Sequence, residues 1–383
     1  MSVEIRFLGH LGNNLFQYAL GRILAEELGH ALQCVAASDR PGFARVEDAS
    51  GIRDQLWHFT EGFADVRLTL PGRSVAAPTY RHVTGEQLHW NGHGINLDWL
   101  LRHGRDYRIV LRGYFQRCEY YLPYRERIRR WYAFTSAVDA PRPGPRDIVL
   151  HLRRSYDMRV LGRLLSLRFY EEILEGHAFD RVYVCGLGID AATRERLARF
   201  RPVYLDLDAL ATLRLLQGAS HIAIANSTFS WWGAWLSDAS RIFFPRPARG
   251  YWSPERPEIA LEVPESRYVV VPDVPLEEGP LFALAPGVQL TTSPSAQGCV
   301  LNVGVPGERP VGLAIDAALT PFATWLAARR APFDVADFMT LDLPRPVVPR
   351  AYALLEVLRQ RAAIDCDPGL LHAFLDTYGV PRR

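Results

Sequence analysis

Apolar and polar positions in the first thirty residues predict a strand followed by a helix. The apolar run Val3–Leu8 predicts a buried strand, and a turn with glycines at positions 9 and 12 follows it. From Leu15 to Leu28, apolar residues recur every three or four positions, which predicts an amphipathic helix that ends at Gly29. Strand, glycine turn and helix in this order are typical of the start of a doubly wound α/β sheet.

A second series of the same kind follows a turn-rich break. Residues 40–105 give no clear pattern, a strand is expected at Arg108–Leu111 and a helix at Tyr124–Trp131, and three prolines crowd residues 139–146. Beyond this break, we expect strands at 147–152, 181–185, 203–207, 221–225 and 241–244, and helices at 167–176, 191–200, 210–218 and 229–236. Regular alternation of strands and helices predicts a parallel sheet, and two such α/β units leave a cleft between them.

The pattern changes again after residue 275. Residues 280–310 alternate apolar and polar positions between glycines and prolines, which predicts hairpin strands, and helices are expected at 321–330, 335–340, 350–362 and 368–378. Strands followed by short helices resemble a winged-helix module. We therefore expect three domains: 1–140 and 146–274, both Rossmann-like, and a small α+β winged-helix-like accessory domain at 280–383.

Composition excludes several classes of function. The net charge of +2 argues against a general nucleic-acid partner. All 44 basic residues are arginine, so a Walker A lysine, a Schiff-base lysine and a kinase strand lysine are excluded. Five widely spaced cysteines favour reduced thiols and a cytoplasmic protein. No signal peptide and no transmembrane segment are expected, and peripheral association with a membrane is left open.

Three segments carry candidate chemistry, and the first is the glycine turn. Gly12 and Asn13 stand where backbone can approach a ligand and where a helix begins, which favours an anion. A plain connection between strand and helix is the alternative. The spacing does not fit the dinucleotide fingerprint GxGxxG, so a nicotinamide cofactor is not supported.

The second segment is His151-Leu-Arg-Arg154, at the carboxyl end of a predicted strand. Two arginines after a buried strand are costly unless they meet an anion, and a diphosphate is the obvious candidate. A solvated basic pair is the alternative reading, and His151 could equally be a core histidine.

The third segment is Asn226-Ser-Thr-Phe-Ser-Trp-Trp-Gly-Ala-Trp235, which opens a helix after a strand. Its first residues are natural helix caps, and their hydroxyls with the free N–H groups of the first turn can hold a phosphate. The candidate binding residues here are Asn226, Ser227, Thr228, Phe229 and Ser230. The tryptophans could pack in the core or wall a base or sugar, and the core is favoured.

Together these segments resemble the bacterial α-1,2-fucosyltransferases of glycosyltransferase family eleven. The family's LGNxxFQYA segment is matched at Leu11–Ala19, its GYFQ at Gly113–Gln116, its HxRR at His151–Arg154 and its NSTFSWW at Asn226–Trp232. The resemblance covers about residues 3–270. It implies a GT-B fold, in which two Rossmann-like domains face a cleft that holds GDP-β-L-fucose.

The resemblance also implies how such an enzyme would work. Fucose would be transferred to a hydroxyl of a glycan acceptor with inversion, without a metal and with no cofactor beyond the donor. Arg153 and Arg154 would hold the diphosphate and stabilise the leaving charge. Asp157 and His10 are the candidate general bases, and a diphosphate oxygen could instead take the proton.

The sequence departs from the family at the residues after its arginines. Ser155-Tyr-Asp157 stands where the family has Gly-Asp-Tyr, and Cys185–Asp190 replaces an acidic FSDD-like segment. Two alternatives therefore stand beside glycan fucosylation. The acceptor could be a protein or peptide side chain recruited by the C-terminal module, or the chain could be an inactive, transferase-like binding protein.

Overall fold

The computed structural model divides the chain into two compact units. It describes residues 1–7, 9–35, 62–66, 81–84, 95–135, 138–155, 158, 163–277, 282–330, 332–333, 337, 341, 343, 347–366 and 371. Unit 1 comprises Met1–Ser155 with Leu165–Pro275, and unit 2 comprises Tyr156–Leu164 with Leu276–Arg383. The chain therefore passes between the units three times.

The N-terminal part of unit 1 is a four-stranded sheet in the order β2-β1-β4-β3. All of its strands run parallel, as the sequence predicted for an α/β unit. The strands are β1 (Ser2–Arg6), β2 (Ala31–Val35), β3 (Arg81–Thr84) and β4 (Ile109–Arg112). The helices are α1 (Leu11–Leu28), α4 (Leu97–His103) and α5 (Arg125–Trp131), with 3-10 turns at Gly104–Asp106, Cys118–Tyr120 and Leu122–Tyr124.

Helix α1 begins four residues earlier than the sequence pattern predicted. Asn13 and Asn14 donate their backbone N–H groups to the carbonyl of His10 at 2.9 and 3.0 Å, which starts the helix at Leu11. Leu11 and Gly12 are buried, so packing overrides the poor helix propensity of this glycine-containing turn. The expected glycine loop is therefore mostly the first turn of α1.

The second sheet of unit 1 has six strands in the order β10-β9-β8-β5-β6-β7, all parallel. Numbered from β5, this is the 3-2-1-4-5-6 order of the Rossmann fold. Its strands are β5 (Ile148–Arg153), β6 (Val182–Leu187), β7 (Val203–Tyr204), β8 (His221–Ala223), β9 (Arg241–Pro247) and β10 (Tyr268–Val274). The predicted alternation is confirmed, and β10 is a strand that the sequence pattern did not reveal.

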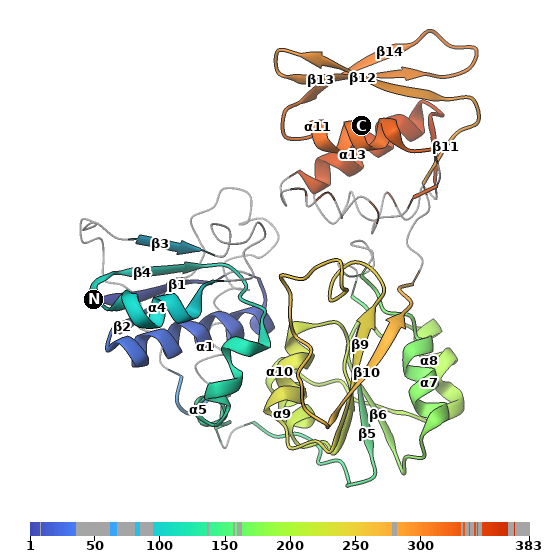
Figure 1. Cartoon of the computed structure of the whole chain (residues 1–383). Helices are drawn as coiled ribbons and strands as arrows, with labels where there is room; N and C mark the ends of the chain where they lie inside the picture. Colours follow the sequence, from blue (N-terminus) through green and yellow to red (C-terminus); the bar gives the residue numbers. More distant parts are fainter. Residues whose placement is uncertain are drawn as a thin grey trace. The chain divides into compact units, whose positions relative to one another are not determined.

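Helices cover both faces of this sheet (Figure 1). They are α7 (Arg168–Gly176), α8 (Ala191–Leu197), α9 (Ala209–Gln217) and α10 (Thr228–Leu236), with a 3-10 turn at Ala198–Phe200. Figure 1 shows α9 and α10 on one face and α7 and α8 on the other. Because strands β5 and β6 lie between these layers, the first four residues of each strand are buried.

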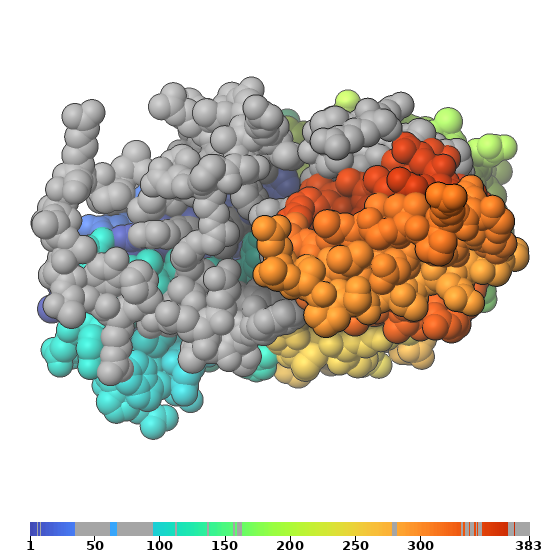
Figure 2. All heavy atoms as spheres, turned by 90° about the horizontal axis from the view of Figure 1, so that it is seen from above, coloured from blue at the N-terminus to red at the C-terminus, as the bar shows by residue number. Residues whose placement is uncertain are grey.

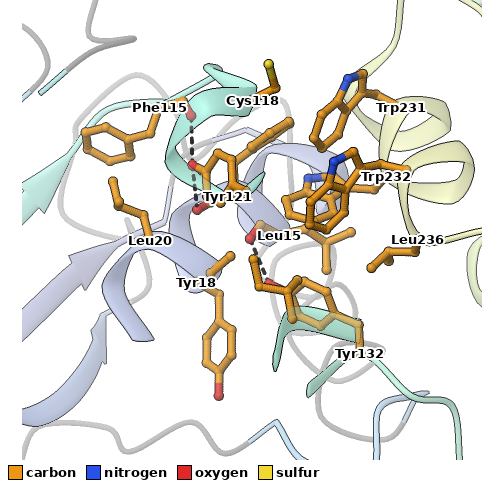
Figure 3. Close-up of a cluster of buried hydrophobic side chains, with 14 of the residues drawn as sticks. Leu15, Tyr18, Leu20, Phe115, Cys118, Tyr121, Tyr132, Trp231, Trp232 and Leu236 are labelled. Atoms are coloured by element: carbon orange, nitrogen blue, oxygen red, sulfur yellow. Dashed lines mark hydrogen bonds between the residues drawn. The ribbon is translucent and has the colours of Figure 1, made fainter. Parts of the chain in front are cut away.

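An aromatic core joins the two halves of unit 1 (Figure 3). Trp231 and Trp232 of α10 are fully buried, and their rings lie 4.9 and 4.8 Å from the ring of Phe16 in α1. The Tyr132 hydroxyl donates to the carbonyl of Leu15 at 2.7 Å, so this polar group is also satisfied inside the core. The favoured interpretation of the tryptophans as core residues is confirmed.

Unit 2 has a core of its own and mixes strands with helices. The strands β12 (Gln289–Ser295), β13 (Gly298–Gly304) and β14 (Val311–Asp316) form an antiparallel sheet, and β11 (Ala283–Leu284) pairs with β15 (Ile364–Asp365). Figure 2 shows the β12–β14 part of unit 2 as a continuous orange surface. The predicted hairpin strands are confirmed.

The helices of unit 2 match the sequence pattern where the structure describes it. Helix α11 spans Thr320–Ala328 and α13 spans Val348–Gln360, close to two of the predicted helices. The other two predictions, 335–340 and 368–378, fall almost wholly outside the described residues. The likeness to a winged helix stays a prediction.

Candidate functional site

The two central strands of the six-stranded sheet end side by side. β5 pairs with both β6 and β8, and the strand order changes direction between β5 and β8. In an open α/β sheet, ligands bind outside the carboxyl ends of the strands at this switch point. His151–Arg154 ends β5 and Asn226–Thr228 follow β8, so both segments singled out by the sequence lie there.

Helix α10 starts at this edge with its amino end uncapped by side chains. Ser227 is the N-cap residue, has an extended backbone (φ −131°, ψ 127°) and makes no side-chain capping bond. The Trp231 N–H is the first that reaches a carbonyl of the same helix start, that of Ser227 at 3.0 Å. The three preceding N–H groups have no helical acceptor, and the first turn holds no acidic residue.

The amino end of α1 meets the amino end of α10. A Cβ atom added at Gly12 would lie 2.4 Å from the backbone nitrogen of Phe229 and 2.7 Å from the carbonyl carbon of Thr228. The Thr228 hydroxyl donates to Oδ1 of Asn13 at 3.0 Å. Only glycine therefore allows this approach, which places residues of two predicted motifs in direct contact.

This meeting of helix ends concentrates positive charge. The amino end of a helix carries roughly half a positive charge, and an acidic residue or a bound anion normally offsets it. Helix α1, like α10, has no acidic residue in its first turn, and its N-cap residue His10 makes no side-chain capping bond. Two helix amino ends in contact therefore favour an anion at this site.

His151 and Arg153 extend from β5 on the face that carries α10. The imidazole of His151 is 3% exposed, and its ring lies 5.5 Å from that of Phe229. Burial, with a contribution from the Arg153 guanidinium, lowers the pKa of His151 to about 3, so the ring is neutral at pH 7. Among the described residues its Nδ1 has no hydrogen-bond partner. Arg153 thus adds the positive side chain on this face.

Arg154 extends to the opposite face of the sheet, because successive side chains of a strand alternate. Its Nε donates to the Thr193 hydroxyl at 2.9 Å, and its Nη1 donates to the carbonyl of Leu165 at 3.3 Å. The Thr193 hydroxyl donates in turn to Asp190 at 2.6 Å. The guanidinium is buried among these groups, so the two arginines do not share one environment. A diphosphate contact by Arg154 stays a prediction.

Of the other predicted site residues, some are buried, one is exposed and one lies outside the described residues. Asn226 is buried at the start of α10, and the Ser230 hydroxyl donates to the carbonyls of Ala225 and Ser227 at 3.1 and 3.0 Å. His10 is exposed at the amino end of α1. Asp157, the other candidate base, lies outside the described residues.

Two residues outside the predicted set contact the site. Gln116 belongs to the GYFQ segment, and its Nε2 donates to Oδ1 of Asn13 at 2.9 Å. Tyr251 follows β9, and its hydroxyl donates to Oε1 of Gln116 at 2.6 Å. The motif itself was a signal for Gln116. Nothing in the local sequence pointed to Tyr251, which is 135 residues away from its partner.

The first turns of α1 and α10 hold no acidic residue. Asp206 and Asp208 follow the edge strand β7, and Asp208 caps α9 by accepting from the backbone N–H of Ala211 at 2.8 Å. Within the described ranges, no cluster of three or more His, Cys, Asp or Glu side chains could hold a metal ion. Across the same ranges, no helix has both the length and the apolar character needed to cross a membrane.

Comparison with known proteins yields weak structural likenesses. No family model and no curated protein matches the sequence. The fucosyltransferase NodZ from Bradyrhizobium is similar over 63% of this chain and 94% of its own, with 13% identity and a TM-score of 0.35. The E. coli heptosyltransferase WaaC, solved with ADP, is similar over 71% of this chain and 93% of its own, with 13% identity and a TM-score of 0.32. With TM-scores this low, neither likeness assigns a function to the chain.

Proposed function

We propose that the chain is an inverting glycosyltransferase of GT-B organisation that uses a nucleoside-diphosphate sugar. One observation carries this proposal: the amino ends of α1 and α10 meet at the switch point of a Rossmann-type sheet, neither first turn holds an acid, and Arg153 ends the central strand β5. A diphosphate is the ligand that such a site suits, because helix N–H groups and an arginine fork both bind phosphate oxygens.

We propose GDP-fucose as the donor and a glycan hydroxyl as the acceptor. This assignment rests on the four motifs that resemble those of the family eleven fucosyltransferases. Residues from three of them come together here: Gly12, Asn13, Gln116 and Thr228. No such sequence support exists for another sugar.

The reaction follows from the charges at the site. The acceptor oxygen forms a bond to the anomeric carbon while the bond from that carbon to the phosphate oxygen breaks. Negative charge then develops on the departing GDP, where Arg153 and the two helix ends stabilise it. The acceptor proton passes to His10, to Asp157 or to a diphosphate oxygen. Asn226 and the hydroxyls of Ser227 and Thr228 would contact the donor, as the sequence predicted.

GDP binding tests the proposal most directly. Isothermal titration of the full chain with GDP should show a single site, and Arg153→Ala should weaken it by about 10- to 100-fold, the value of a charge-assisted bond. Arg168→Ala is the control, because Arg168 is exposed and, in the part of the chain that the structure describes, its guanidinium pairs with Glu172 of α7. Equal affinity of the two variants would refute the assignment of the site.

A protein or peptide acceptor is the second candidate. Its support is that unit 2 has an independent core, as a module for binding a partner would need. Transfer of radioactive fucose to oligosaccharide acceptors, compared with transfer to protein in a lysate, distinguishes the two. Binding of GDP-fucose without hydrolysis or transfer would instead favour an inactive binding protein.

A further inference from the structure

Four side chains from distant parts of unit 1 form one chain of hydrogen bonds at the proposed donor site. The Tyr251 hydroxyl donates to Oε1 of Gln116, 2.6 Å away. Nε2 of Gln116 donates to Oδ1 of Asn13 at 2.9 Å, and the Thr228 hydroxyl donates to the same oxygen at 3.0 Å. Gln116 is buried, so its amide has no water to replace these partners.

The atoms in contact set the direction of donation along this chain, because an amide oxygen can only accept and an amide NH₂ group can only donate. Hydrogen bonds between two oxygens cluster near 2.7–2.8 Å, whereas those from nitrogen to oxygen cluster near 2.9–3.0 Å. The 2.6 Å contact of Tyr251 therefore fits an O–H donor to the amide oxygen of Gln116, and the 2.9 Å contact fits its N–H donor. Turning the Gln116 amide over would place a nitrogen at the shorter distance.

The amide of Asn13 is oriented as a result. Its oxygen accepts two hydrogen bonds from within the protein, which leaves its NH₂ group to point elsewhere. That nitrogen lies beside Gly9, where an added Cβ atom would be only 2.4 Å away. Gly9 has a φ of 73°, which glycine adopts readily, and thus leaves room for this orientation.

Backbone strain flanks two residues of this chain, Gln116 and Tyr251. Phe115, next to Gln116, has a φ of 52°, and Trp252, next to Tyr251, has a φ of 70°. Both are bulky residues for which such values are rare. Phe115 is held by the Tyr121 hydroxyl, which donates to its carbonyl at 2.8 Å (Figure 3). Strain of this kind persists where the surroundings enforce it, typically at functional sites.

We propose that Tyr251 and Gln116 are positioning residues that hold the Asn13 amide with its NH₂ group toward the donor diphosphate. This inference rests on the proposed function for the identity of the ligand. It rests on the hydrogen bonds described above for the orientation of the Asn13 amide. An amide held in this way presents two N–H donors to phosphate oxygens, whereas a rotated amide would present a repelling oxygen. We call the four residues Tyr251, Gln116, Asn13 and Thr228 the amide relay.

Titrations of GDP into the full chain test the proposal. Tyr251→Phe removes one hydroxyl and should weaken GDP binding by about five- to twentyfold, since the Gln116 amide is then free to turn over. Gln116→Glu should have a larger effect, because a carboxylate cannot donate to Asn13 and instead attracts its NH₂ group. Tyr268→Phe is the matched control: its buried hydroxyl has no hydrogen-bond partner among the described residues, and GDP affinity should change by less than about twofold.

A double-mutant cycle separates orientation from general damage. In an Asn13→Asp background, which already replaces the NH₂ group by an oxygen, Tyr251→Phe should cause no further loss of GDP affinity. Equal GDP affinity of the wild type and Tyr251→Phe would overturn the inference, and so would full additivity of Tyr251→Phe and Asn13→Asp.

If the proposed function is wrong, the titrations give a different result. Absence of GDP binding by the wild type would refute the assigned ligand. The relay is then decided by thermal unfolding, in which Tyr251→Phe should lower the unfolding temperature more in the wild type than in an Asn13→Ala background. Equal shifts in the two backgrounds would overturn the relay itself.

Discussion

Gly12→Ala tests the contact between the two helix ends. The added Cβ atom would lie 2.4 Å from one backbone atom of α10 and 2.7 Å from two others, whereas real contacts of this kind essentially never fall below 3.0 Å. Because the opposing atoms belong to the backbone, no side chain can turn away, and the start of α10 must move relative to α1. We expect a displacement of roughly half an ångström to one ångström.

The displacement has two measurable consequences. Overpacking of this kind costs about 1–3 kcal/mol, and a loss of about 2 kcal/mol lowers the unfolding temperature by about 4–8 °C in a unit of this size. It also moves the N–H groups of α10 away from Asn13, so GDP affinity should fall by about tenfold or more. Differential scanning fluorimetry and calorimetric titration measure the two effects separately.

Gly176→Ala is the matched control for this substitution. Gly176 is also in a helix, α7, and an added Cβ atom there would meet nothing within 4 Å. Alanine should therefore leave GDP binding unchanged and raise the unfolding temperature slightly, because alanine favours a helix by about 1 kcal/mol over glycine. The reasoning would be refuted if Gly12→Ala matched this control in both stability and affinity.

Three further predictions concern the arginines, the histidine and the ligand. Arg153→Ala should lower fucosyl transfer by about 10²–10³ with little change in unfolding temperature. Arg154→Ala should lower that temperature, because it removes the buried donor to the Thr193 hydroxyl and to the Leu165 carbonyl. Fluorimetry and transfer assays with both variants would show the reverse if the assignment of faces were wrong. The pKa of His151 is lowered to about 3 in the folded state, so the unfolded chain binds more protons between pH 3 and 6.5. The free energy of unfolding should therefore fall as the pH drops through that range. Urea denaturation of His151→Gln should show a weaker pH dependence than that of the wild type. GDP affinity should be unchanged by EDTA, because arginine and helix ends supply the positive charge, and a sharp loss restored by magnesium or manganese would contradict this.

The sequence predicted the structure best where a feature depends on residues that are close together in the chain. Local alternation of strands and helices was enough to predict the second sheet and to place His151–Arg154 and Asn226–Thr228 at strand ends. Local glycine content was misleading at α1, where burial of Leu11 and Gly12 made a helix from an expected loop.

Contacts between distant segments could not be predicted in the same way. The meeting of Gly12 with Phe229 and of Gln116 with Tyr251 joins residues more than a hundred positions apart, and no pattern in one sequence states such a pairing. The different surroundings of Arg153 and Arg154 depend on which helices cover each face of the sheet. Strand alternation alone puts the two arginines on opposite faces, but it does not say what each face contains.

Because the chain passes three times between the two units, unit 2 cannot be exchanged between proteins as one continuous segment. A domain attached only at a terminus can be exchanged by one crossover, in evolution or in the laboratory. Here Tyr156–Leu164 belongs to unit 2 although it is encoded in the middle of unit 1, directly after the arginines of β5. Its end is tied to the later part of unit 2 by the N–H of Glu277, which donates to the carbonyl of Leu164 at 2.7 Å. A functional exchange of unit 2 would therefore require two coordinated replacements, and chimaeras that replace only the C-terminal segment should be poorly soluble.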